Sequence, residues 1–523
     1  MNVKHNLKSS KVLIILCLLG VLCFLLFFLI NFDQLKTKKL PNIVLILADD
    51  FGVGDIQAHF PNNKIPTPCL DHLVSEGMSF KDAHSSSSVC TPTRYGLLTG
   101  RYCWRTPLQR HVLACYEPPL IDSGRLTLPE ILRRKGYRTA AIGKWHLGWT
   151  WPGPIQNTMG EYNILRSTEW DFTESIEDGP IAHGFDYYFG PDVPNFPPYC
   201  FIENNRTIGL PTAQKESRNL DGVPGAMLPG WEMDEILPAI TRRAVDYIKE
   251  QSSSGQPFFL YFSMTSPHEP IAPSKDFEGK SGIAPIADFI MQTDWSVGEI
   301  LKAIDAAGIK ENTLLIFTAD NGHSKYTGWD KLVDAGHYPS GPYRGGKGDI
   351  WEGGHRVPFI VRWPGNIAAG SSNHQLISLT DIFETCAELV DMELPPNAGE
   401  DSKSFLPHLI GEARMVDNRK SLISHSVNGE FAIRNSNWKL VFKAAEAHNG
   451  NLSQSGDVQL YNLEEDVSET TDLSSQYPQV VEELRGLLEA QIKRGRSTPG
   501  PIQKNDVDVV FNRFPKRRWA ESQ

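Results

Sequence analysis

The stretch NIVLILADD, residues 42–50, decides the fold of this 523-residue chain. Its apolar run, 43–47, contains only β-branched residues and leucine, which is typical of a strand buried on both faces of a parallel sheet. Two adjacent carboxylates, Asp49 and Asp50, follow the run directly. Ligands of open α/β sheets bind beyond the carboxyl ends of the strands. The stretch therefore predicts a buried strand with a polar site where that strand ends.

Further apolar runs along the chain extend the predicted sheet. They lie at 138–142, 258–262, 314–317 and 358–362. Between the second and third of these runs, apolar residues recur at helical spacing from Ile286 to Ile304 and predict a crossover helix that links two parallel strands. The pattern as a whole predicts an α/β fold with a large, mostly parallel sheet and helices on both faces.

Composition divides the chain into three predicted parts. Residues 1–40 contain an unbroken apolar run, 12–30, which is just long enough to cross a bilayer. We predict a transmembrane signal-anchor there, with a cleaved signal peptide as the alternative. Residues 41–405 are predicted to form the main domain, and 406–523 a smaller C-terminal subdomain. In the latter, three runs predict an antiparallel sheet and a fourth an amphipathic helix: 431–434, 439–442, 458–463 and 478–494.

The net charge, the predicted anchor and the cysteine content limit the expected partners, cellular location and disulfide bonds. The net charge of −11 argues against a nucleic-acid partner. The predicted anchor places the rest of the chain outside the cytoplasm, in the periplasm, at the cell surface or in the secretory pathway. Six cysteines lie beyond the apolar run, too few and too scattered for a disulfide framework, although Cys103 and Cys115 could close a short loop.

The stretch SSSSVCTPTRYGLLTGRY, residues 85–102, predicts a reactive side chain at the start of a helix. Pro92 suits the first helical position, and Thr91 then suits the N-cap. Cys90 is expected just before the first turn, where free N–H groups favour an anion and lower the pKa of a thiol. The alternative is a buried cysteine with a packing role only.

Oxygen ligands follow two of the predicted strands. Besides Asp49 and Asp50, the sequence places Asp320 and Asn321 directly after the run 314–317. Adjacent carboxylates repel each other unless a cation lies between them, and four oxygen donors without histidine or cysteine suit Ca²⁺ or Mg²⁺. Each pair alone is also a turn signal. Both pairs after strong strands of one sheet favour a metal site.

Cationic and titratable residues follow the other strands. They lie in GKWHLG (143–148), SPHEP (266–270) and GGKG (345–348), which leads into WEGGHRVP (351–358). Together with Arg94, they predict a positive pocket on an otherwise acidic chain, suited to an anionic transition state. The candidates are Arg94, Lys144, His146, His268 and Lys347.

In these blocks the chain resembles the type I sulfatases, the formylglycine-dependent, arylsulfatase A-like branch of the alkaline phosphatase superfamily. The resemblance rests on C-x-P-x-R at 90–94, on NIVLILADDFGVGDI and TLLIFTADNGH, and on the three cationic blocks. It covers most of the chain, from Asn42 to Glu464, and HGFDYYFG at 183–190 fits arylsulfatase A-like members. The N-terminus departs from the family, because a long apolar anchor replaces a clear cleavable signal.

The resemblance implies a sulfuric ester hydrolase with two special groups. Cys90 would be oxidised to formylglycine by a formylglycine-generating enzyme, and its hydrate would attack sulfur with help from a carboxylate such as Asp320. One Ca²⁺ would be held by Asp49, Asp50, Cys90, Asp320 and Asn321. Arg94 and His146 would hold the formylglycine, and Lys144 and Lys347 would neutralise sulfate oxygens. His268 would protonate the leaving group.

The expected substrate is a sulfated carbohydrate, with an aryl sulfate as the alternative. Candidates for its binding wall are Trp149, Trp151, Asn195, Phe196 and Tyr199, which are equally suited to packing. His323 is expected either at the substrate or at the surface. Two alternative functions remain open: a phosphonate or phosphate monoester hydrolase of the same superfamily, and a catalytically silent protein that binds sulfated glycans if Cys90 stays a thiol.

Overall fold

The computed structural model describes residues 39–153, 170–216, 222–412, 418–443, 447–448, 451–452 and 457–511. The chain divides into two compact units, Met1–Pro41 and Asn42–Gln523, and the second contains the fold described below. The predicted membrane segment, 12–30, lies outside the described residues. Within them, none of the helices combines the length and apolar character that crossing a bilayer requires. The domain boundary at 405/406 stays a prediction.

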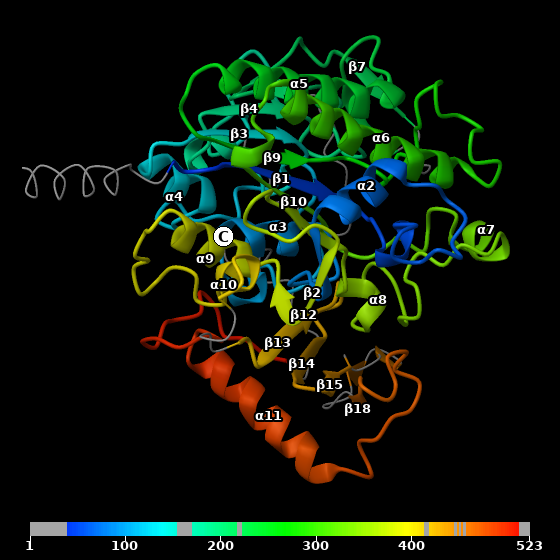
Figure 1. The fold of residues 1–523 in the computed structure, drawn as a ribbon, viewed down its shortest axis with the longest axis vertical. Coiled ribbons are helices and arrows are strands. Elements are labelled where there is room, and N and C mark those ends of the chain that lie inside the picture. The colour runs from blue at the N-terminus through cyan, green and yellow to red at the C-terminus, as the bar shows by residue number, and fades with distance from the viewer. Residues whose placement is uncertain are drawn as a thin grey trace, which may run out of the picture. The chain divides into compact units, whose positions relative to one another are not determined.

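A ten-stranded, mixed and mostly parallel sheet forms the centre of this unit (Figure 1). Its strands, in spatial order, are β12 (Ser371–Ser378), β2 (Met78–His84), β11 (Phe359–Arg362), β10 (Thr313–Ala319), β1 (Asn42–Ala48), β9 (Phe258–Ser263), β3 (Arg138–Gly143), β4 (Tyr187–Gly190), β5 (Ile202–Glu203) and β6 (Arg206–Thr207). The five apolar runs predicted as strands are β1, β3, β9, β10 and β11. The predicted fold class is therefore confirmed.

Strand β1 lies inside the sheet and is buried along its whole length. It pairs in parallel with β10 on one side and with β9 on the other, and β9 pairs in parallel with β3. Because all four strands run in the same direction, their carboxyl ends lie at one edge of the sheet. Strand β11 pairs with β10 in the antiparallel sense, a direction that its apolar run does not encode.

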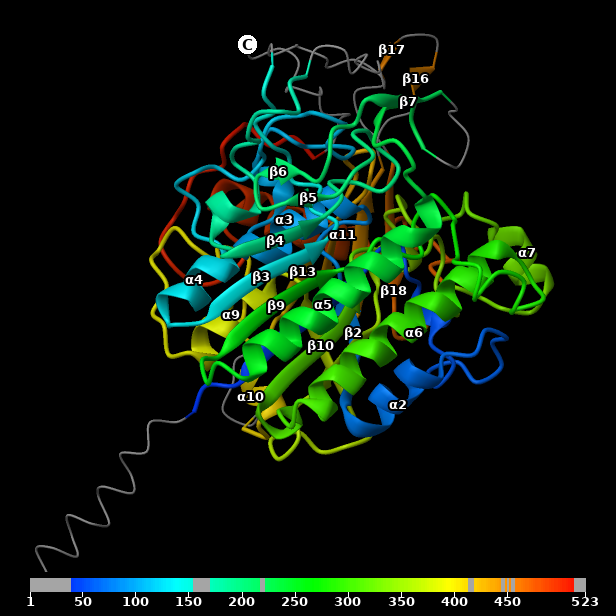
Figure 2. The same cartoon turned by 90° about the horizontal axis from the view of Figure 1, so that it is seen from above.

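Helices cover both faces of the sheet (Figures 1 and 2). On one face α2 (Pro68–Glu76) and α5 (Ile236–Ser252) pack against α6 (Pro285–Ala306), the predicted crossover helix between β9 and β10. On the other face α3 (Cys90–Thr99), α4 (Leu128–Arg134) and α9 (Asp381–Leu389) pack together. The short α-helices are α7 (Trp329–Asp334), α8 (Glu352–His355) and α10 (Leu406–Leu409). The 3-10 turns are Val53–Asp55, Cys103–Arg105, Pro180–His183, Met233–Glu235 and Lys310–Asn312.

The C-terminal part contains a second, antiparallel sheet of four strands, β13-β14-β15-β18. These are β13 (Ser421–His425), β14 (Phe431–Asn435), β15 (Trp438–Phe442) and β18 (Val458–Asn462), with α11 (Pro478–Lys493) packed on them. Three of the four strands and the helix were predicted. Two further pairs are small: β7 (Ala213–Lys215) with β8 (Gly225–Met227), and β16 (Ala447–His448) with β17 (Asn451–Leu452).

Apolar packing and buried charges join the two sheets. Tyr102 and Trp104, which follow α3, belong to the apolar core between the C-terminal sheet and α11. Lys439 of β15 lies 3.0 Å from Glu352 Oε1 of α8 and 2.8 Å from Glu469 Oε1. All three side chains are buried, so this contact is an ion pair shielded from water.

Two local expectations are corrected. Helix α3 begins at Cys90, and its N-cap is Val89, in extended conformation, rather than Thr91. The Thr91 hydroxyl instead accepts a hydrogen bond from the backbone N–H of Leu113, over 3.3 Å. None of the six described cysteines forms a disulfide, so the loop between Cys103 and Cys115 is not closed by one.

Candidate active site

The polar residues that follow β10, β1, β9 and β3 meet at the carboxyl edge of the sheet. In the sheet register Ala48 pairs with Ala319, and Ser263 pairs with both Leu47 and Gly143. The four segments that follow these strands therefore leave the sheet side by side. They place there Asp49 and Asp50, Asp320 and Asn321, His268, and Lys144 and His146.

The four predicted oxygen ligands lie together and are buried. The side-chain amide of Asn321 donates a hydrogen bond to Asp50 Oδ1 over 2.7 Å, and the Asp50 backbone N–H donates to Asp320 Oδ1 over 3.2 Å. Asp50 has a φ of 62°, in the left-handed region that few residues other than glycine occupy. Backbone strain of this kind persists where surrounding contacts hold it, often at functional sites.

Arg94 of α3 connects the carboxylates. Its Nε and Nη2 atoms donate to Asp320 Oδ2 over 3.1 and 2.7 Å, and Nη2 lies 3.6 Å from Asp49 Oδ2. Nη1 donates to the Lys144 carbonyl over 3.3 Å and to the Ser263 hydroxyl. The guanidinium is fully buried, so these acceptors fix its plane as well as its position.

Two lysines complete the charge balance. Lys144 Nζ lies 2.7 Å from Asp49 Oδ2, and Lys347 Nζ lies 2.8 Å from Asp50 Oδ2. Three buried carboxylates thus face three cations. The protein side chains alone leave the pocket close to neutral, and any divalent cation added to it makes the pocket positive.

The donor set fits a hard divalent cation. Among the described residues, Asp49 Oδ1 and Asn321 Oδ1 are buried and accept no hydrogen bond. Burial, followed by repulsion from Asp49, raises the pKa of Asp320. Orphaned oxygen acceptors beside mutually repelling carboxylates are stabilised by a bound metal ion. His268 also lies within ligand distance of a centre shared with Asp49 and Asp50.

Cys90 begins α3 beside this cluster and is only 2% exposed. Burial lowers the pKa of Lys347, whereas Asp50, Cys90 and Asp49 raise it, and the net shift is upward. Cys90 also belongs to the groups that raise the pKa of Arg94, after Asp320. The side chain at position 90 therefore interacts electrostatically with both cations.

The two predicted histidines, His146 and His268, are neutral, and each forms a hydrogen bond to a different backbone carbonyl. His146 donates from Nε2 to the Leu113 carbonyl over 2.9 Å, and burial together with Lys144 lowers its pKa to about 3. His268 donates from Nδ1 to the Glu269 carbonyl over 2.6 Å, which directs Nε2 toward Asp50, 3.9 Å away. Burial and Lys347 lower the pKa of His268 to about 3.

His323 is buried, so the expectation of surface exposure is wrong. Its Nδ1 lies 3.0 Å from Asp55 Oδ2, and its backbone carbonyl accepts a 2.9 Å hydrogen bond from the Lys347 N–H. The sequence analysis missed Asp55, which also contacts His337 Nε2 over 2.7 Å. Its position five residues after Asp50, within the same motif, was the available signal.

The candidates for a binding wall divide into two groups. Trp149, Trp151 and Tyr199 are buried in aromatic packing or hydrogen bonds away from the charged cluster; Trp149, for example, packs on Tyr188. Phe196 packs with its ring centroid 5.9 Å from that of His146, and Asn195 donates to Glu269 over 3.1 Å. Only Asn195 and Phe196 thus contact residues of the site.

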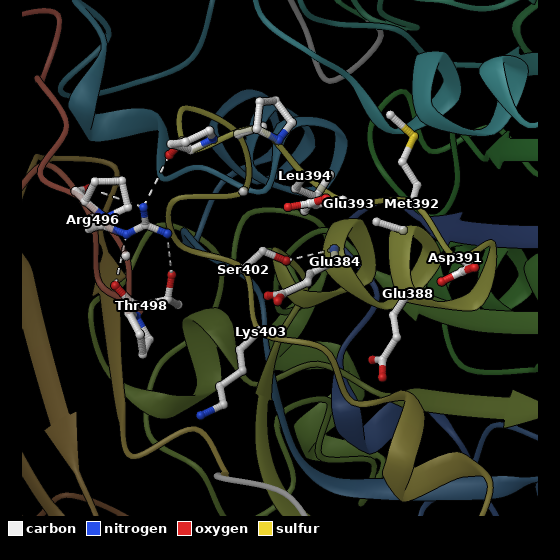
Figure 3. A pocket seen from close by; sticks show the side chains of 18 residues that line it. Glu384, Glu388, Asp391, Met392, Glu393, Leu394, Ser402, Lys403, Arg496 and Thr498 are labelled. Atoms are coloured by element: carbon white, nitrogen blue, oxygen red, sulfur yellow. Dashed lines mark hydrogen bonds between the residues drawn. The ribbon is translucent and has the colours of Figure 1, made fainter.

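A separate pocket of about 760 Å³ lies between the end of α9, the loop 391–403 and the segment 496–501 (Figure 3). Glu384, Glu388 and Lys403 line it together with Arg496, whose guanidinium bonds to nearby carbonyls. None of the predicted site residues lines this pocket. It is therefore distinct from the charged cluster at the strand ends.

Comparison with known proteins gave matches to sulfatases along most of the chain. Residues 41–392 match the family model described as sulfatase, and residues 346–494 match the one described as N-sulphoglucosamine sulphohydrolase, C-terminal. An N-acetylgalactosamine-6-O-sulfatase of Bacteroides thetaiotaomicron is 33% identical over 504 residues, which cover 88% of this chain and 94% of that protein. Arylsulfatase G of Mus musculus is 31% identical over 489 residues, covering 86% of each protein.

Solved structures agree with this similarity. One of them comes from work on the metabolism of multiple glycosaminoglycans by Bacteroides thetaiotaomicron. It matches this fold with a TM-score of 0.75 and 31% sequence identity, and the match covers 87% of this chain and 99% of the other.

Proposed function

The chain belongs to the sulfatase family and is a sulfuric ester hydrolase, and we propose that it removes sulfate from a sulfated carbohydrate by means of formylglycine and calcium. The convergence of Asp49, Asp50, Asp320 and Asn321 with buried cations beside Cys90 carries this proposal.

Calcium is the proposed ion, held by Asp49, Asp50, Asp320 and Asn321 together with the modified residue 90. When bound, it supplies a fixed positive centre that orients and polarises a sulfate oxygen. The two orphaned oxygens, Asp49 Oδ1 and Asn321 Oδ1, support this assignment, because carboxylate and amide oxygens are typical calcium ligands.

Position 90 is the proposed site of the nucleophile. Formylglycine made from Cys90 by a formylglycine-generating enzyme supplies, as its hydrate, the oxygen that attacks sulfur. Arg94 and His146 hold the hydrate from the α3 and β3 sides. Asp320, which Arg94 holds through Oδ2, is the proposed acceptor for the proton of the attacking hydroxyl.

The remaining cations act on the sulfate. Lys144 and Lys347 reach in from opposite sides of the carboxylate cluster and neutralise the sulfate oxygens. His268 donates a proton from Nε2 to the leaving alkoxide, and its Nδ1 contact with the Glu269 carbonyl fixes the ring for that transfer. The arriving anion raises the pKa of this imidazole, since a nearby negative charge favours the protonated form.

Carbohydrate is the proposed substrate class. Named relatives act on 6-sulfated N-acetylgalactosamine, and an aryl sulfate is the alternative substrate. The proposed location is extracytoplasmic, with residues 12–30 as a membrane anchor. Recovery of the full-length protein in the membrane fraction after alkaline washing tests the anchor, and its release into the supernatant contradicts it.

One set of measurements tests the function. Mass analysis of the peptide that contains Cys90 is expected to show the aldehyde, and the purified protein is expected to hydrolyse sulfate esters. Faster turnover of a phosphonate or phosphate monoester than of a matched sulfate ester favours the hydrolase alternative. An alkylatable thiol at position 90, with binding of sulfated glycan and no turnover, favours the silent binding protein.

A further inference from the structure

The turn that carries His268 also carries a second polar side chain at the pocket. Glu269 follows His268 directly, and its backbone carbonyl is the acceptor that fixes the His268 ring. The Glu269 side chain is only partly buried. Burial raises its pKa, Lys347 lowers it and Asp50 raises it again, with a net upward shift. The Glu269 carboxylate thus interacts electrostatically with Lys347 and Asp50.

A neighbouring loop holds this carboxylate in place. The side-chain amide of Asn195 donates to Glu269 Oε1 over 3.1 Å. Asn195 is itself 93% buried, and its backbone carbonyl accepts hydrogen bonds from the Tyr199 hydroxyl and the Val223 N–H, both over 2.9 Å. Asn195 thus holds Glu269 Oε1 from the neighbouring loop, and the partly exposed carboxylate has a second oxygen, Oε2, that can accept a hydrogen bond.

The same loop is attached to the other side of the site. Asp192 accepts a 3.1 Å hydrogen bond from the His146 backbone N–H, and Phe196 packs against the His146 ring. The segment 192–196 thus spans from the turn after β3 to the turn after β9. Its position relative to both histidines is set, as recognition of a substrate group beside the scissile ester requires.

We propose that Glu269, held by Asn195, determines substrate specificity: it accepts a hydrogen bond from a sugar hydroxyl close to the sulfate ester and excludes a second anionic group at that place. The proposal rests on the proposed function, since it concerns the same pocket. A half-buried carboxylate repels a neighbouring sulfate or carboxylate, and a hydroxyl both avoids that repulsion and supplies a donor. The substrate class is therefore a sugar with a single sulfate ester, the one that is cleaved, and a free hydroxyl close to it.

The test compares two sugars with the full-length protein. N-acetylgalactosamine 6-sulfate and its 4,6-disulfate differ only in a second anion beside the ester. The wild-type protein is expected to favour the monosulfate in kcat/KM by roughly tenfold or more, a ratio typical of one unfavourable charge contact. Glu269→Gln keeps the size and the acceptor for Asn195 but removes the charge, and is expected to reduce this preference roughly tenfold. Glu203→Gln, a surface change in β5, is the matched control and keeps the wild-type ratio.

The possible outcomes distinguish failure of the specificity role of Glu269 from failure of the proposed sulfatase reaction. A ratio within twofold of wild type in Glu269→Gln overturns the specificity role and leaves a structural tie between loops. Failure to hydrolyse any sulfate ester, 4-nitrophenyl sulfate included, overturns the proposed function instead. Calorimetric titration of both sugars into Cys90→Ala protein, with and without Glu269→Gln, measures the affinity ratio without turnover. Equal affinity for the two sugars in the Cys90→Ala protein overturns the specificity role in that case as well.

Discussion

Asn321 Nδ2 donates a 2.7 Å hydrogen bond to Asp50 Oδ1, although the two residues lie 271 positions apart in the sequence. Their strands, β10 and β1, are adjacent and parallel, so pairing of the strands is what brings the two side chains together. The bond uses the amide nitrogen and leaves the amide oxygen without a partner among the described residues. Pairing of β1 with β10 thus brings together the oxygen donors of the proposed cation site.

Calcium is expected to stabilise the protein through this site. Removal of divalent cations with EGTA should lower the melting temperature, and calcium should restore it, because a ligand at one hundred times its Kd stabilises the folded state by about 2.7 kcal/mol. Differential scanning calorimetry measures the shift. Asp320→Asn should abolish the calcium-dependent part. An equal shift in wild type and variant contradicts the proposed ligand set.

Lys347 is expected to contribute to turnover far more than its neighbour Lys325. Lys347 is 18% exposed and paired with the buried Asp50, whereas Lys325 is 42% exposed and paired with Asp349. Lys347→Ala should lower kcat for a sulfate ester by about 10²–10³, the usual loss when one preorganised charge contact to a transition state is removed. Steady-state kinetics at saturating calcium measure the effect, and Lys325→Ala is the control. Similar kcat values for the two variants speak against Lys347 as a sulfate ligand.

Glu384 in the separate pocket is expected to make stability fall as pH rises. Burial, followed by Asp381, raises the pKa of Glu384 from 4.5 to about 7. The folded state then binds more protons than the unfolded state between these values, so stability present at pH 4.5 is lost as pH rises through 7. Glu384→Gln should therefore stabilise the protein at pH 8, by up to about 3 kcal/mol, and have little effect at pH 4.5.

Urea unfolding at both pH values measures this difference. Glu393→Gln, an exposed change in the same pocket lining, provides the comparison. Equal stabilisation by Glu384→Gln at pH 4.5 and at pH 8 contradicts the raised pKa of Glu384 as its cause.

Lys439 is expected to be essential for the attachment of the C-terminal sheet. Its removal in Lys439→Met leaves Glu352 and Glu469 buried without their shared cation, which should cost about 3–5 kcal/mol. Chemical denaturation gives the free energy of unfolding. Lys443→Met removes a more exposed pair with Glu430 and should cost less than about 1 kcal/mol. Equal losses in the two variants contradict the buried ion pair as a link between the sheets.

The sequence predicted strands that contain a recognisable apolar run and missed β2, which has none. β1, β9 and β10 are continuous apolar runs because both of their faces are covered. β2, with the sequence MSFKDAH, contains Lys81 and Asp82, and Asp82 is paired with Arg356 and Arg434. Charged residues that are satisfied only by distant parts of the chain carry no periodic signal, so such a strand is not recognised from its own sequence.

The site was predictable to the extent that it lies at strand ends. Parallel strands bring their carboxyl ends to one edge, so the convergence of Asp49, Asp50, Asp320 and Asn321 followed from the strand prediction. The neutral state of His146 did not follow, because it depends on burial and on Lys144. The Asn195–Glu269 contact was also out of reach, since it joins two loops whose relative position only the folded chain defines.

The burial of Cys90 limits when it can be modified. In the folded chain the thiol is 2% exposed at the start of a helix packed under the sheet edge, so an enzyme that oxidises it has no access. Residues 313–319, which form β10 and close the pocket, are synthesised more than 200 positions later. The interval between translation of residue 90 and pairing of β10 is therefore the period available for the proposed oxidation of Cys90. Faster folding of this chain in a heterologous host would lower the fraction of active enzyme.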